Sequence, residues 1–168
     1  MAAAQSAWSP MTESNRLAEL SLAVRDSTLK RLRRVPPGAE NWRPSARSLS
    51  FADIAHHLLN ADSWLFEKLV NPSLERMVAH AGEAGDTDGP RFLDLVERLE
   101  NSGRERAARL AEMSQSQLET LVPDERFGGE VSVWWIVVRG NLDHEAHHRG
   151  QLATFLRILE DRGQQCGS

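Results

Sequence analysis

The stretch Asn141-Leu-Asp-His-Glu-Ala-His-His-Arg-Gly-Gln-Leu152 lies inside a longer segment, 132–161, whose apolar residues recur at helical spacing. On a helix, the four-residue spacing of His144 and His148 puts both imidazoles on one face, one turn apart. Gln151 falls on the same otherwise apolar stripe. Burying two histidines there costs free energy unless a strong partner satisfies them. The pattern therefore predicts a core helix that supplies two ligands to one metal ion.

Three further segments show helical periodicity. They span 12–35, with Thr12 as N-cap; 50–70, where Ser50-Phe-Ala-Asp53 resembles a capping box; and 90–113, with a proline in the first turn. Pro36-Pro37-Gly38, Asn71-Pro72 and Gly163 are expected to end helices. Four amphipathic helices with breaks between them predict an all-α fold, a four-helix bundle, as a single domain over residues 1–168.

The connections between these helices are expected to be mostly loop. They cover 71–89 and 114–129, the second with a short turn at 118–121. Residues 131–138 are β-branched and aromatic, which suits a strand, but they run directly into the helical stripe of 132–161. We therefore favour helix there and expect no strand in the chain.

A third ligand can come from the helix predicted over 50–70. His57 lies at the edge of its apolar stripe, whereas His56 points nearly opposite and is expected to face solvent. Asp53 and Asn60 flank His57 and could orient an imidazole, although Asp53 could equally serve only as a helix cap. Two alternatives thus stay open for Asp53.

Three further residues can be placed relative to this histidine pair. His147 lies about 60° from the line of His144 and is a weaker candidate for a ligand or pocket residue. Gly140, on the stripe beside His144, would leave room for a ligand or let a neighbouring helix approach. His80 falls in a predicted loop and is expected to be exposed.

Composition excludes several classes of protein. The chain has 168 residues, is 40% hydrophobic and carries a net charge of −4, which fits a globular domain and argues against a dedicated nucleic-acid binder. The basic run Lys30-Arg31-Leu-Arg33-Arg34 is expected to close a helix. Cys166 is the only cysteine and is expected to be a thiol in a frayed tail. With neither a secretion signal nor about 18 uninterrupted apolar residues, we expect a cytoplasmic protein without a membrane span.

One motif points to a protease. His144-Glu145-Ala-His147-His148 satisfies H-E-x-x-H, the zinc-protease signature in which the glutamate is the general base. A metzincin would continue with glycine at position 151, where this chain has Gln151, and only about 20 residues follow His148. We therefore reject the metalloprotease interpretation.

The same segment resembles a different family. His144 to Leu152 is similar to the C-terminal signature of the DinB/YfiT-like superfamily, H-x-x-x-H-R-G-Q followed by Leu, Ile or Val, and His57-Leu58 resembles its earlier histidine element. Helix order, loop placement and length agree over nearly the whole chain. The resemblance implies an up-down-down-up four-helix bundle, often a homodimer. It also implies one divalent metal, zinc or nickel, held by His57, His144 and His148, with water or substrate in the open positions.

The resemblance further implies a small-molecule thiol and an electrophile as partners, whereas nucleic acid is not expected because of the net charge of −4. Characterised relatives include thiol transferases that use bacillithiol, mycothiol or glutathione, and a mycothiol-dependent maleylpyruvate isomerase. Metal-dependent hydrolysis is an alternative because a metal lowers the pKa of bound water. Gln151 and Glu145 are the candidate catalytic residues. A non-catalytic, metal-stapled stress-response protein would need a fourth ligand, such as Asp53, Glu145 or His147.

Overall fold

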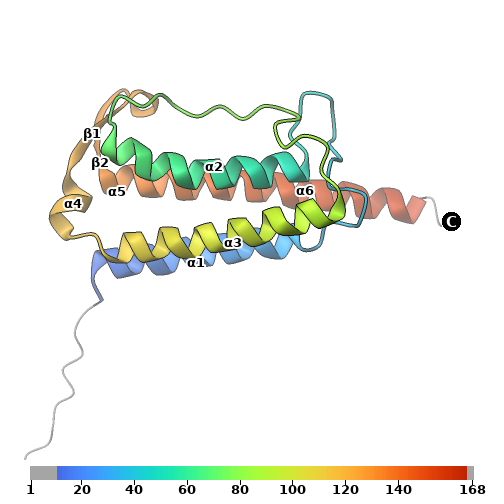
Figure 1. Cartoon of the computed structure of the whole chain (residues 1–168), viewed down its shortest axis with the longest axis horizontal. Coiled ribbons are helices and arrows are strands. Elements are labelled where there is room, and N and C mark those ends of the chain that lie inside the picture. The colour runs from blue at the N-terminus through green and yellow to red at the C-terminus, as the bar shows by residue number, and fades with distance from the viewer. Residues whose placement is uncertain (1–10, 166–168) are drawn as a thin grey trace, which may run out of the picture.

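Four long helices pack side by side in the computed structural model, which describes residues 11–165 (Figure 1). They are α1 (Glu13–Leu32), α2 (Phe51–Val70), α3 (Gly89–Ala111) and α6 (Asp143–Gln165). Helices α1 and α6 run in one direction and α2 and α3 in the other, because the segment after α2 returns along the length of the bundle (Figure 1). The predicted up-down-down-up four-helix bundle is confirmed.

The helices begin where side chains can cap their free N–H groups. Thr12 accepts from the backbone of Asn15 at the start of α1, and Asp88 accepts from Arg91 at the start of α3. At α2, Ser50 and Asp53 form the predicted capping box. Helix α1 ends at Leu32, three residues before the predicted end.

The connection between α3 and the last helix is more ordered than predicted. It contains α4 (Gln115–Glu119), β1 (Leu121–Asp124), the 3₁₀ turn η1 (Glu125–Phe127) and β2 (Gly129–Ser132). The two strands pair antiparallel, with Leu121 opposite Ser132. The expectation of no strand was therefore wrong. Each strand has only four residues, too few for an alternating pattern to stand out in the sequence.

The last helical segment is also not a single α-helix. It consists of α5 (Val133–Trp135), the π-helix η2 (Ile136–Leu142) and α6, which continues past Gly163 to Gln165. A π-helical turn holds more residues than an α-helical turn, so successive residues lie less than 100° apart, and such turns are frequent at functional sites. The assumed 100° per residue therefore holds only from Asp143 onward. Cys166 lies outside the described residues.

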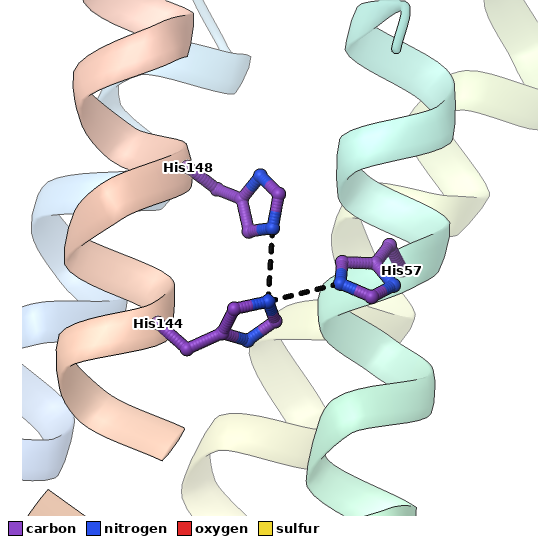
Figure 2. Close-up of side chains that lie close together, drawn as sticks. All are labelled: His57, His144 and His148. Atoms are coloured by element: carbon purple, nitrogen blue, oxygen red, sulfur yellow. Dashed lines mark hydrogen bonds between the residues drawn. The ribbon is translucent and has the colours of Figure 1, made fainter. Parts of the chain in front are cut away.

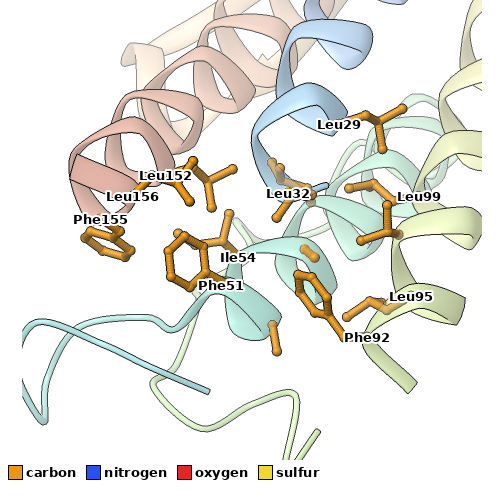
Figure 3. Close-up of a cluster of buried hydrophobic side chains, with 14 residues drawn as sticks. Leu29, Leu32, Phe51, Ile54, Phe92, Leu95, Leu99, Leu152, Phe155 and Leu156 are labelled. Atoms are coloured by element: carbon orange, nitrogen blue, oxygen red, sulfur yellow. The ribbon is translucent and has the colours of Figure 1, made fainter. Parts of the chain in front are cut away.

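A charged layer divides the core into two apolar clusters. One cluster joins all four helices near the start of α2, and Figure 3 shows its labelled members. The other lies toward the hairpin and includes Leu17, Leu65, Leu110 and Ile136. On each of the four long helices, one buried charged residue lies between the residues that belong to the two clusters. These residues are Arg25 on α1, Asp62 on α2, Arg106 on α3 and Glu145 on α6. No helix among residues 11–165 is long and apolar enough to cross a bilayer.

Candidate metal centre

The three predicted ligands lie together between α2 and α6. His57 projects from α2, and His144 and His148 project from successive turns of α6, so that the three rings point toward one another (Figure 2). The Nε2 atom of His144 lies 3.0 Å from Nε2 of His57 and 3.0 Å from Nε2 of His148. The three ligand atoms all fall within 4.8 Å of one another.

Burial keeps these imidazoles neutral. It is the main cause that lowers the pKa of His144 to about 3, helped by the neighbouring His148 and His57. Burial likewise lowers the pKa of His148 to about 4, although a hydrogen bond to Gln151 opposes it. The pKa of His57 is lowered too, again mainly by burial. At neutral pH each ring therefore has one nitrogen with a free lone pair.

The donor set fits a divalent metal ion. The amide oxygen of Gln151 lies 2.9 Å from Nδ1 of His148 and can only accept, so Nδ1 carries the proton and Nε2 presents a lone pair to the cluster. Among the described residues, His57 Nδ1 is the one fully buried side-chain polar atom without a hydrogen-bond partner. The only polar neighbour of this ring is therefore on its Nε2 side, in the histidine cluster. Two zinc-bound nitrogens in tetrahedral geometry would lie about 3.3 Å apart, close to the observed spacing.

Comparison with known proteins agrees with this fold. Residues 22–152 match the DinB superfamily. The chain belongs to the DinB superfamily. The crystal structure of a DinB-like protein, YjoA from Bacillus subtilis, matches with a TM-score of 0.64 and 18% identity, over 86% of this chain and 92% of that one. At that identity the likeness concerns the fold alone. No curated protein matches the chain.

Gln151 links one ligand of this DinB bundle to the surface. Its amide oxygen faces His148, and its amide nitrogen lies 3.1 Å from Nε2 of the exposed His147. His147 itself stays outside the three-histidine cluster. Gln151 therefore holds the orientation and tautomer of His148, as a residue behind a metal-bound histidine usually does.

Neither residue expected to flank His57 forms a hydrogen bond with it. The carboxylate of Asp53 caps α2 and accepts from the backbone N–H groups of Gly82 and Ala84. Burial would raise the pKa of Asp53, but these backbone hydrogen bonds outweigh it and lower the pKa. The amide of Asn60 lies near His56 and Glu83. Of the two alternatives for Asp53, the structure therefore supports the capping role.

Glu145 also points away from the histidines. Its carboxylate accepts from Arg25 Nε at 2.8 Å and from Arg106 Nη1 at 2.9 Å. The same two arginines bind Asp62 at 2.9 and 2.7 Å, and the four side chains are between 1% and 4% exposed. A carboxylate held by two buried cations is a poor proton acceptor, so this geometry does not support Glu145 as a general base. It is not free to act as a fourth ligand either.

The arginines of this network were not singled out from the sequence, although a signal was present. Arg25 follows Leu17 and Ser21 at spacings of four on the buried face of α1. Arg106 likewise stands three residues after the buried Gly103 on the inner face of α3. A charged residue on a core stripe is almost never fully buried unless it is paired.

A cavity of about 170 Å³ opens beside the metal centre. It is bounded by η2, α2, the start of α6 and the segment after α2; its lining residues are Ala61, Trp64, Arg76, Met77, Arg126, Gly140, Asn141 and His144. Gly140 was expected to leave room beside the first ligand. A Cβ at Gly140 would lie 2.7 Å from Arg126 Nη2, so the arginine uses that room. No pattern in the sequence singled out Arg126.

Proposed function

We propose that this DinB protein is a metal-dependent enzyme that joins a small-molecule thiol to an electrophile, with zinc or nickel held by His57, His144 and His148. One observation carries the proposal: three histidine nitrogens converge without a fourth histidine, cysteine or carboxylate among residues 11–165. Structural zinc sites usually have four protein ligands, whereas catalytic sites keep a position open. The cavity that reaches His144 gives a substrate access to that position.

The chain's own residues prepare the site in two ways. Burial keeps the imidazoles unprotonated, so they can donate lone pairs at neutral pH. Gln151 fixes the tautomer of His148. A divalent ion bound there would act as a Lewis acid that lowers the pKa of a thiol. Because the family that this chain resembles includes thiol transferases, we favour thiol transfer over hydrolysis. An assay with a panel of esters tests hydrolysis directly.

Metal content is the first test. Untagged wild-type protein should contain about one equivalent of zinc or nickel by mass spectrometry, and His57→Ala, His144→Ala and His148→Ala should each lose it. His80→Ala is the matched control because His80 is exposed and is not one of the three clustered histidines. Metal that survives all three ligand substitutions would overturn the site.

Activity is the second test. Glutathione, bacillithiol and mycothiol are each offered with 1-chloro-2,4-dinitrobenzene, on which a C–S bond replaces the C–Cl bond, chloride leaves and the thiol proton passes to buffer. We expect metal-dependent product with at least one thiol, lost in the three variants. Full metal content with no turnover for any thiol would refute the transferase. Light scattering of the same sample tests the expected homodimer.

A further inference from the structure

We infer that the cavity beside His144 binds an anionic group of the substrate, such as a carboxylate, and that Arg126 and Arg76 recognise it. The inference rests on the proposed function in one respect only: it places this anion next to the reacting thiol or electrophile. The cavity and its arginines stand independently of any metal.

Arg126 is held rigidly at the cavity wall. Asp124, which is buried, accepts from Arg126 Nε at 2.9 Å and also binds Nη2. The guanidinium lies 4.5 Å from the centre of the Trp64 ring and packs against Gly140, which leaves no space for a Cβ. A hairpin turn and a glycine of the π-helix thus place one cation beside a metal ligand. A preorganised cation of this kind binds an anion with little loss of side-chain entropy.

The guanidinium keeps hydrogen-bond donors for a ligand. It has five N–H groups, of which Asp124 takes two and the carbonyl of Gly140, 3.3 Å from Nη1, takes one. Two donors remain on a side chain that is 24% exposed. Planar paired donors match the two oxygens of a carboxylate.

Asp124 neutralises the charge of Arg126, so the net positive charge of the cavity comes from Arg76. It is exposed, lines the cavity, and makes no ion pair within the part of the chain that the structure describes. Arg76 and Arg126 also border an adjoining groove together with the exposed Glu125. Trp64 and Met77 add an apolar surface. The site therefore suits a small ligand with one anionic group on a short carbon chain.

Succinate binding to metal-free protein tests the anion site directly. The indole N–H signal of Trp64, assigned with Trp64→Phe, should shift saturably with succinate and not with uncharged succinamide. Arg76→Gln should weaken succinate binding about tenfold, as expected for loss of a charge-assisted hydrogen bond. Arg98→Gln, an exposed arginine on α3, should leave it unchanged. Absence of a shift, or equal binding by Arg76→Gln, overturns the inference.

A cobalt-loaded sample separates this inference from the proposed function. Binding of 2-mercaptoethanol, seen as a new sulfur-to-cobalt absorption band, tests thiol binding alone. 3-Mercaptopropionate should bind about tenfold more tightly, and Arg76→Gln should remove that advantage. Equal binding of both thiols overturns the anion site and leaves the proposed function standing. Succinate binding without any thiol band refutes the proposed function and leaves the anion site standing.

Discussion

Replacing Glu145 by glutamine should destabilise the protein by about 3 kcal/mol at pH 7. Burial alone would raise the pKa of Glu145, but the ion pairs with Arg25 and Arg106 outweigh it and lower the pKa from 4.5 to about 2. That lowering of the pKa corresponds to roughly 3 kcal/mol in favour of the charged carboxylate in the folded state. The substitution keeps the size of the side chain and leaves two buried guanidinium groups short of an anion. Breaking a buried ion pair in this way typically costs about 3–5 kcal/mol.

Urea unfolding in the presence of a chelator measures this cost without interference from metal. With a slope of about 2 kcal/mol per molar urea, the midpoint should fall by roughly 1.5 M, followed by tryptophan fluorescence and far-ultraviolet circular dichroism. Because the folded pKa of Glu145 is depressed, its charge contributes fully above pH 4.5 and loses its contribution as pH falls toward 2. The gap between wild type and Glu145→Gln should therefore shrink to less than half by about pH 3.

Glu160→Gln provides the matched control on the same helix. Glu160 pairs with Arg34 at 2.7 Å, but the two side chains are 56% and 63% exposed. An exposed pair contributes at most about 1 kcal/mol, so the midpoint should barely move. A loss below about 1 kcal/mol for Glu145→Gln, or one equal to that of Glu160→Gln, would refute the claim that the buried network stabilises this fold.

Three other outcomes follow from the same geometry. Gly103→Ala should destabilise the protein by about 1–3 kcal/mol because its Cβ would lie 2.6 Å from Arg25 Cγ. Gly150→Ala has open space around it and should stabilise α6 by up to about 1 kcal/mol. Thermal melts that rank the two variants in the opposite order would contradict this packing. The pKa values of the two α6 histidines, about 3 and about 4, keep these rings neutral as pH falls. From about pH 7 to about pH 5.5 the apparent Kd for zinc should thus rise by less than about eightfold, which is roughly the cost of one imidazole of ordinary pKa, because only His57 can contribute and its pKa is lowered too. Gln151→Leu should weaken zinc binding about 10–100-fold by competition titration, since it frees His148 Nδ1; unchanged affinity would exclude the orienting role.

Local patterns predicted most of the fold. Helical periodicity and capping residues such as Ser50 and Thr12 act within a few residues of sequence, so the four helices could be located before any tertiary contact was known. The spacing of His144 and His148 likewise depends on one helix alone. His57 was placed by the apolar stripe of its own helix.

What the sequence did not reveal depends on one short hairpin and on contacts between segments that are far apart in the chain. The partner of β1 lies across a short turn, and Gly128 in that turn has a φ of 76°, which a glycine adopts without strain. Arg126 reaches Gly140 only because this hairpin folds back over η2. The pairing of Glu145 was not predicted because its cations belong to α1 and α3, 120 and 39 residues away in the chain.

The charged network and the histidine cluster constrain the same helix from two sides. On α6, neighbouring positions lie 100° apart, so His144 can face α2 while Glu145 faces the arginines of α1 and α3. Rotating α6 by one residue would direct the carboxylate toward His57 and leave the two buried arginines to share Asp62 as their only carboxylate. Apolar residues alone tolerate such rotations far better than buried charges do. We therefore infer that the network's main contribution to the candidate metal centre is to fix the rotation of α6, and with it the direction of His144 and His148.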